Sequence, residues 1–180
     1  MTLVATVTQV LPFLTLLSQI VLAIGLLFFI FSPGARGALE QFLSRRALLI
    51  AFIVALAATL GSLFYSEIAH YEPCKLCWFQ RIFLYPQVVL LGIALLKNDK
   101  GITPYAIMLS AIGGVIALYH YLLQRGIAPE LPCSAVGLSA SCSKVFVMSF
   151  GYITIPMMAL TAFLLIIILL SLPHIRLKKY

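Results

Sequence analysis

Long apolar runs alternate with short polar connections along this chain. Five apolar runs stand out, at residues 10–31, 47–66, 78–96, 103–123 and 151–172. Each is close to the roughly 20 residues that a helix needs to cross about 30 Å of hydrocarbon. Inside a bilayer only helices and closed barrels satisfy every backbone hydrogen bond, and the short alternating strands of a barrel are absent from this sequence. The pattern therefore predicts an all-α integral membrane protein with five spanning helices.

Composition leads to the same class of protein. Charged residues make up 9% of the 180 residues, against roughly 25% in a soluble domain. The first ten residues carry no Lys or Arg, and no small-residue cleavage site follows the first apolar run. We therefore expect that run to be retained as a membrane helix and not removed as a signal peptide.

Most of the basic residues lie in the first loop, the third loop and the C-terminal tail. Eight of the twelve Lys and Arg residues lie there, namely Arg36, Arg45, Arg46, Lys97, Lys100, Arg176, Lys178 and Lys179. By the positive-inside rule these segments face the cytoplasm. Five spans then place the N-terminus and both cysteine-bearing loops on the opposite, oxidising side. The net charge of +7 is interpreted as a topology signal, so we expect membrane lipid and no nucleic acid among the partners.

The first cysteine pair lies in the stretch PCKLCWFQR, at the start of the third run. Cys74 and Cys77 have the spacing of small redox-active disulfides, and the N-terminus of a helix favours a thiolate at Cys77. Arg81 follows on the same helix face, so its guanidinium can reach toward the thiol. The alternatives are a structural disulfide or half of a zinc site, with Arg81 a snorkelling interfacial residue.

The second pair, Cys133 and Cys142, lies in the polar loop LPCSAVGLSASCSK. A long loop closed by one disulfide suits docking of another thiol protein, although the same bond can simply tie down a wet loop. A zinc site built from both pairs would depart from the usual spacing of two to four residues between ligands, so no metal is predicted.

Polar residues also mark the outer end of the fourth run, where the stretch HYLLQ places His120 and Gln124 one helical turn apart. His120 and Arg81 both lie about one turn below the outer surface, so we expect them to border one pocket. A cation and an imidazole in an apolar pocket suit the head group of a lipid-soluble quinone. The alternative for His120 is a hydrogen-bonded packing residue.

Together these motifs resemble the disulfide bond formation protein B family (DsbB), most closely its BdbC branch. The resemblance rests on CKLCWFQR, HYLLQ, the loop cysteine pair and GYITIPMMALTAF, and it covers about residues 47–172. It implies a four-helix enzyme of the prokaryotic cytoplasmic membrane that reoxidises a DsbA- or BdbD-like thioredoxin-fold thiol oxidase. The electrons would pass to a quinone, either ubiquinone or menaquinone.

The resemblance also implies roles for individual residues. Cys74 and Cys77 would be the quinone-coupled pair, with Cys77 engaging the quinone. The other pair would exchange with the partner protein, with Cys133 forming the mixed disulfide. Arg81 would polarise the quinone oxygen, and His120 would lie beside the ring together with Gln124, while Cys142 completes the loop disulfide.

The chain departs from the family by one additional helix. We expect residues 1–46 to form an extra N-terminal transmembrane helix and a basic cytoplasmic loop, residues 47–172 a DsbB-like four-helix bundle, and residues 173–180 a basic cytoplasmic tail.

A rival interpretation is a protein resembling vitamin K epoxide reductase, but in those proteins the loop pair of cysteines normally precedes the CxxC pair. A nonenzymatic metal-binding or scaffold membrane protein is a further alternative, and it predicts bound zinc.

Overall fold

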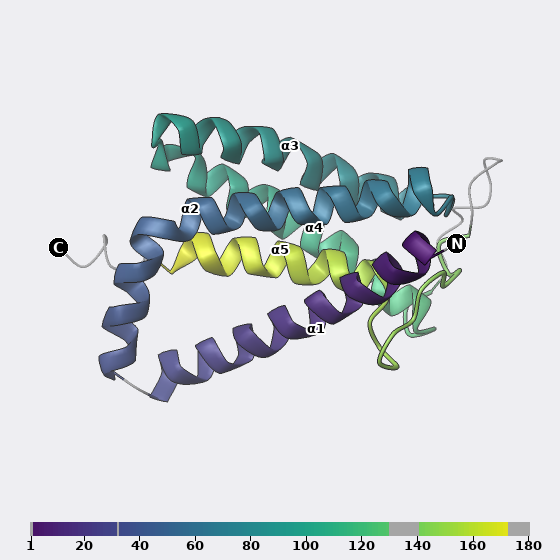
Figure 1. Ribbon diagram of the computed structural model, residues 1–180, viewed down its shortest axis with the longest axis horizontal. Coiled ribbons are helices and arrows are strands. Elements are labelled where there is room, and N and C mark those ends of the chain that lie inside the picture. The colour runs from purple at the N-terminus through teal and green to yellow at the C-terminus, as the bar shows by residue number, and fades with distance from the viewer. Residues whose placement is uncertain (1, 32, 130–140, 173–180) are drawn as a thin grey trace.

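The computed structural model describes residues 2–31, 33–129 and 141–172 (Figure 1). The described part is helical apart from its connections. The helices are α1 (Thr2–Phe31), α2 (Pro33–Leu63), a π-helix η1 (Phe64–Ile68), α3 (Lys75–Lys97), a short 3-10 helix η2 (Lys100–Ile102), α4 (Thr103–Gln124) and α5 (Ile155–Ser171). Cys133 and the basic tail 173–180 lie outside the described residues, so the predictions made for them stay predictions.

Four of the helices form a closed bundle. Each of α2, α3, α4 and α5 packs against two neighbours in the order α2–α3–α4–α5 and back to α2, whereas α1 lies outside this ring against α2 and α5 (Figure 1). Buried apolar residues from all four bundle helices fill the interior, among them Ala51, Leu91, Ala117 and Phe163. The predicted all-α fold, a four-helix core with one additional N-terminal helix, is confirmed.

The bundle is assembled from membrane-length helices. Four helical segments are long and apolar enough to span a bilayer, ending at Phe31, Ile68, Lys97 and Gln124. The fifth, α5, is apolar throughout but has 17 residues, which is the lower limit for crossing the hydrocarbon. Together with the apolar composition, this makes the chain a multi-pass membrane protein.

The first connection differs from its prediction. We expected residues 32–46 to be a loop, but α2 begins at Pro33, and this stretch is helical up to the expected start of the second span. Proline is tolerated in a helix's first turn, and Leu43 and Ala47 bury their side chains in the core, which stabilises the extension. Figure 1 shows that this first part of α2 bends away from the direction of the rest of the helix.

Two more boundaries shift at the end of the bundle that carries the cysteines. The second span continues through η1 to Ile68 and α3 begins at Lys75, so the connection is shorter than the predicted loop 67–77. The last helix begins at Ile155 instead of residue 151, which moves Pro156 into its first turn. Pro156 therefore costs no helical hydrogen bond.

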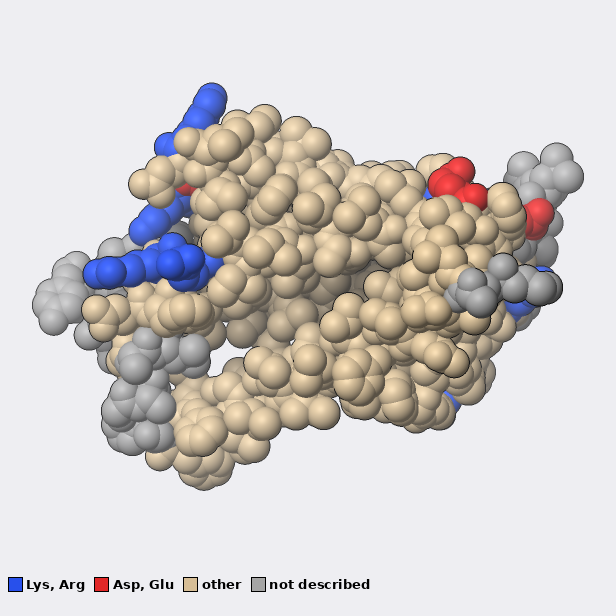
Figure 2. Space-filling model, in the orientation of Figure 1, with Lys and Arg blue, Asp and Glu red and all other residues tan. Residues whose placement is uncertain are grey.

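Charge divides the two ends of the bundle. Figure 2 shows the largest group of blue Lys and Arg side chains at the end where α3 ends, and most of the visible red Asp and Glu side chains at the far end, together with a few blue ones. Arg45 and Arg46 lie in the first part of α2, and Lys100 Nζ donates a hydrogen bond to the backbone oxygen of Ser44 at 3.4 Å. The first cysteine pair lies at the opposite end, where α3 begins.

Candidate functional site

The first cysteine pair forms the start of α3. Cys74 is the N-cap residue, and its Sγ accepts a hydrogen bond from the backbone N–H of Cys77 at 3.4 Å. The two residues are free thiols whose sulfur atoms lie 3.2 Å apart, with Cys74 as the donor and Cys77 as the acceptor. The first turn of a helix favours negative charge. The predicted position of Cys77 at the helix N-terminus is therefore found, one turn inside the cap.

The two thiols are not equivalent. Cys74 is 3% exposed. The hydrogen bond to Cys77 and, after it, burial raise the pKa of the Cys74 thiol to about 12, although His120 acts in the opposite direction. Cys74 therefore holds its proton in the reduced state, while the accepting sulfur of Cys77 is the one suited to carry charge.

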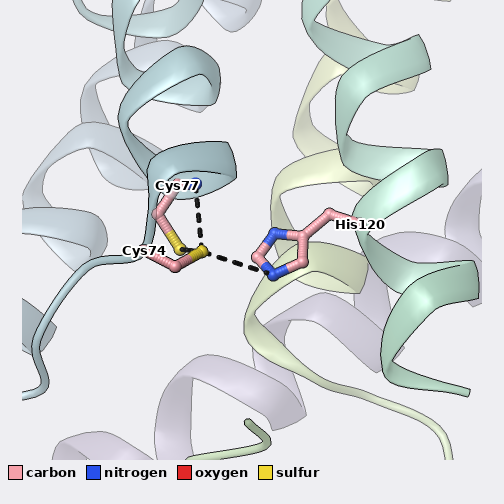
Figure 3. Close-up of side chains that lie close together, drawn as sticks. All are labelled: Cys74, Cys77 and His120. Carbon is pink, nitrogen blue, oxygen red and sulfur yellow. Dashed lines mark hydrogen bonds between the residues drawn. The ribbon is translucent and has the colours of Figure 1, made fainter. Parts of the chain in front are cut away.

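His120 approaches this pair from α4 and is 1% exposed. Its Nε2 lies 3.6 Å from Cys74 Sγ (Figure 3). The same Nε2 lies 3.1 Å from the backbone oxygen of Cys142, and Nδ1 lies 2.9 Å from Nε2 of Gln80. The amide N–H of Gln80 donates to Nδ1, which leaves the proton of neutral imidazole on Nε2. That N–H donates to the Cys142 carbonyl and faces the sulfur of Cys74.

Cys142 comes from the loop before α5 and is also buried. It is 4% exposed and packs in one cluster with Cys74, Leu76 and Leu123, and Cys77 lies against this cluster. The loop is fastened to α4, because Gln124 Nε2 donates to the Lys144 backbone oxygen at 3.0 Å. A cysteine of the second pair therefore lies beside the first pair.

Arg81 lies on the other side of Cys77 and is 9% exposed. Its Nε donates to Ser62 Oγ at 3.1 Å and its Nη2 donates to the Ser62 backbone oxygen at 3.0 Å. The guanidinium also lies 5.2 Å from the centre of the Trp78 ring and 5.8 Å from that of Tyr85. These hydrogen bonds end on neutral oxygens of α2, so they fix the guanidinium without cancelling its charge.

Two cavities meet at Cys77. The larger, about 250 Å³, lies between α1, α2, α3 and α5 and is lined on α3 by Cys77, Gln80 and Arg81. The smaller, about 20 Å³, is lined by Cys74, Cys77, His120 and Gln124. Cys77 borders both.

The predicted single pocket for Arg81 and His120 is therefore wrong. Arg81 follows Cys77 by one turn and faces α2, whereas His120 reaches the cysteines from α4. Gln124 lies with His120 at the smaller cavity and away from Arg81. The expected guanidinium–thiol contact takes a different form, because Arg81 is bound to Ser62 and shares the α3 wall of the larger cavity with Cys77.

Three of these side chains can also offer ligand atoms to a metal ion. Cys74, Cys77 and His120 present two sulfur atoms and a ring nitrogen that all lie within 4.8 Å of one another. Thiolate and imidazole together suit a soft or borderline cation such as Zn²⁺. The prediction that the site holds no metal remains a prediction.

Sequence reasoning missed Gln80 and Ser62. Gln80 is 6% exposed and bonds the histidine, and Ser62 holds both the guanidinium and the hydroxyl of Tyr85, at 3.1 Å. A polar amide inside an apolar run is a signal that could have identified Gln80. A serine in a membrane helix is too common to single out without knowing which residue faces it.

Comparison with known proteins gives a consistent family. Residues 44–172 match the family model described as Disulfide bond formation protein DsbB. This range contains α2 from residue 44 onward, the other three bundle helices and both cysteine pairs, and it leaves α1 outside.

Individual relatives agree. The chain is 46% identical over 120 residues to "Probable disulfide formation protein C" of Bacillus cereus, a match that covers 67% of this chain and 86% of the relative. It is 45% identical over 123 residues to "Disulfide bond formation protein C" of Bacillus subtilis, covering 67% and 87% of the two chains. A "Probable disulfide formation protein" of Deinococcus radiodurans is 42% identical over 137 residues, covering 72% and 89%. No solved structure matches the chain.

Proposed function

The chain belongs to the disulfide bond formation protein DsbB family, and on this basis we propose that it reoxidises a partner's dithiol and passes the electrons to a membrane quinone. Family membership implies a membrane thiol–disulfide oxidoreductase. The observation that carries the finer proposal is the position of Cys77 between two different cavities. On one side it meets buried cysteine and histidine, and on the other an apolar space with a cation.

The first step is exchange with the partner, a DsbA- or BdbD-like thioredoxin-fold thiol oxidase. A thiolate of the reduced partner attacks the sulfur of Cys133 and breaks the Cys133–Cys142 disulfide. A mixed disulfide forms at Cys133 and Cys142 leaves as a thiolate. Burial of Cys142 in the cluster that contains Cys74 supports this order, because the released sulfur then lies beside the first pair.

The electron pair then moves inward through three further exchanges. Cys142 attacks Cys74 in the Cys74–Cys77 disulfide, and Cys77 leaves as a thiolate. The partner's second thiolate resolves the mixed disulfide, which releases the oxidised partner and the thiolate of Cys133. Cys133 then attacks Cys142, which restores the loop disulfide and releases Cys74. One disulfide has been made in the partner and one broken at the start of α3, so the electrons balance.

His120 and Gln80 act on the sulfur of Cys74. The Nε2–H of His120 lies 3.6 Å from Cys74 Sγ, where it stabilises the negative charge that appears as Cys74 leaves. Gln80 is a positioning residue, since its 2.9 Å hydrogen bond to Nδ1 keeps the proton on the nitrogen that faces the sulfur. We propose this role for His120 because it lines the smaller cavity with the cysteines.

The larger cavity fits a quinone. Most of its lining is apolar, yet Arg81 and Cys77 lie together on its α3 wall, which suits an apolar molecule with an electronegative head group. When bound, ubiquinone or menaquinone supplies a two-electron, two-proton acceptor for the pair of electrons held by the dithiol. Cys77 offers its thiolate to the cavity, and the Cys74–Cys77 disulfide re-forms as the electrons leave.

Arg81 supplies the fixed positive charge in this cavity. The guanidinium is buried and held by Ser62, so little reorganisation is needed when negative charge develops near it. A positioned charge of this kind stabilises a reduced oxygen atom more than a neutral one, which favours electron transfer away from the dithiol.

The sidedness follows from charge. We propose that the end of the bundle with Arg45, Arg46 and Lys100 faces the cytoplasm and that both cysteine pairs face the extracytoplasmic side. Residues 47–172 then form the catalytic domain, with residues 1–46 and 173–180 as additions to it. Disulfides are stable on the extracytoplasmic side, so the sidedness and the chemistry support one another.

The test is quinone-dependent turnover by the purified protein. A reduced thioredoxin-fold substrate should be oxidised catalytically when a quinone is added, and the quinone should be reduced in equal amount. Cys→Ser variants at the four cysteines should each abolish turnover. Full turnover in the Cys77→Ser variant would contradict the proposal.

A further inference from the structure

The additional helix α1 takes no part in the function proposed so far. It lies outside the residues that match the family model, and most of its surface is exposed. In a membrane-spanning helix this exposed apolar surface faces lipid. Its inner face, however, is held against the bundle at defined points.

Three contacts attach the N-terminal two thirds of α1. Pro12 is fully buried, and Leu11 lies so near Gly61 of α2 that a Cβ on the glycine would be 3.4 Å from the leucine side chain. Further along, Gln19 Nε2 donates to Thr161 Oγ1 at 2.8 Å and Gln19 Oε1 accepts from the Tyr152 hydroxyl at 2.8 Å. Hydrogen bonds between membrane helices and close approach at a small residue are the usual means of fixing their packing.

Between these contacts α1 lines the larger cavity. Leu11, Leu14, Thr15 and Ser18 form part of its wall, opposite Cys77, Gln80 and Arg81 of α3. Beyond Gln19, α1 leaves the bundle, and Figure 2 shows an opening between its C-terminal part and the rest of the molecule. The cavity therefore has α1 as one of its walls, and the opening lies further along the same helix.

We propose that α1 is part of the quinone site, with Leu11 and Thr15 contacting the bound quinone and its apolar tail leaving through the opening beside α1. This inference rests on the proposed quinone reduction and extends it to residues outside the family-matched region. The occupant is a quinone with a long apolar side chain, because the cavity carries a charge beside Cys77 and most of the rest of its lining is apolar. Thr15 and Leu11 are thereby assigned as binding residues.

The first test compares two tryptophan substitutions on α1. Thr15→Trp places a bulky ring in the cavity. It should therefore raise the KM for quinone about tenfold, which corresponds to about 1.4 kcal/mol of binding free energy. Leu17→Trp is the matched control, since Leu17 is 48% exposed on the outer face of the same helix, and its KM should stay within about twofold of wild type. Oxidation of one equivalent of partner without quinone should be unchanged in both variants.

The second test leaves the protein unmodified, so it does not depend on correct folding of a variant. An azido-quinone is photoactivated on the purified protein, and trypsin then releases residues 1–36 as one fragment, because the first Lys or Arg is Arg36. Label on this fragment, removed by excess plain quinone, is expected.

The outcomes separate the inference from the proposed function. Label confined to other fragments, or an unchanged KM in Thr15→Trp while the wild type reduces quinone, overturns the role of α1 and leaves the proposed function standing. A wild-type protein that oxidises its partner once but never reduces quinone overturns both.

Discussion

The two sides of Cys77 differ in size, polarity and supporting helix. On the side of α4, Cys74, His120 and Gln124 line a space of about 20 Å³, and Cys142 packs against Cys74 beside it. On the side of α1 and α2, a cavity of about 250 Å³ is mostly apolar and has Arg81 in its wall. A small polar site suits exchange between sulfur atoms that must come into bonding contact. A large apolar site suits a bulky acceptor that arrives from the membrane.

Because the two sites differ, thiol–disulfide exchange and electron transfer to the acceptor should respond to different substitutions. Sulfur exchange needs hydrogen bonds at Cys74, and transfer to the acceptor needs a charge beside Cys77. Only a change at Cys77, whose sulfur borders both cavities, should stop both the exchange and the transfer. The expected effects can therefore be ranked by how much of the site each substitution touches.

The largest effect is expected from Cys77→Ser, which removes the sulfur shared by both sides. Steady-state oxidation of the partner should fall to background with or without quinone, because the disulfide that accepts the electron pair can no longer form. One equivalent of partner should still be oxidised by the Cys133–Cys142 disulfide. Stopped-flow oxidation of the partner, followed by thiol titration, checks both statements. Repeated turnovers in this variant would remove Cys77 from the pathway.

Arg81→Gln tests the role of the larger cavity alone. Loss of a charged hydrogen bond costs about 1.5–3 kcal/mol, so the KM for quinone should rise about tenfold to hundredfold. Arg81→Lys should recover part of this loss, because it keeps the charge and loses the fork of donors. Oxidation of the first equivalent of partner should not change.

A matched control for Arg81 lies at the outer end of α4. Arg125 donates to the Gly151 backbone oxygen at 3.2 Å and lies away from both cavities. Arg125→Gln makes the same charge change on the same side of the membrane. If it raises the KM as much as Arg81→Gln does, the effect comes from overall charge and the assignment of Arg81 fails.

His120→Ala tests the role of the smaller cavity alone. The rate at which reduced partner delivers electrons to the Cys74/Cys77 pair should fall about tenfold, as expected for a lost hydrogen bond to a charged sulfur. Gln80→Leu should give a smaller decrease, because the imidazole remains but its tautomer is no longer fixed. The KM for quinone should be unchanged in His120→Ala. A raised KM with an unchanged exchange rate would return His120 to the quinone site.

The smallest effect concerns the reactivity of Cys74 in the reduced protein. Its pKa is raised to about 12, first by the hydrogen bond with Cys77 and then by burial, so it remains a neutral thiol at any lower pH. Iodoacetamide at about pH 8 should therefore alkylate Cys77 before Cys74. Cys77→Ala removes the largest cause, so the Cys74 pKa should fall and its alkylation should quicken. Mass spectrometry of the alkylated peptides checks the order, which would be reversed if Cys74 carried the thiolate.

Much of the fold could be predicted from the sequence because a membrane span is a local property. Apolar runs of about 20 residues identified every long helix, and the boundary of the third run placed Cys77 at the start of one. The ends were less predictable. Residues 33–46 are helical because Leu43 and Ala47 reach the core, and this contact depends on how α2 packs.

The site was predictable in its residues but not in their grouping. Cys77 and Arg81 were identified from spacing, and His120 from its depth in the membrane. However, the depth of a residue in the membrane does not determine the direction in which its side chain points. The separation of His120 from Arg81 depends on the rotation of α4 about its axis, which a pattern along one helix does not contain. The hydrogen bond between Gln80 and His120 depends on the same rotation.

The helix cap made by Cys74 links disulfide exchange at this residue to the order of the first turn of α3. The sulfur that accepts the Cys77 N–H is also the sulfur that exchanges, and a bond to Cys142 would draw it away from the helix end. Loss of an N-cap costs about 1 kcal/mol of helix stability. The first turn of α3 should therefore loosen while the two pairs are joined and tighten once Cys74 is released, so the amide proton of Cys77 would exchange fastest in that joined state.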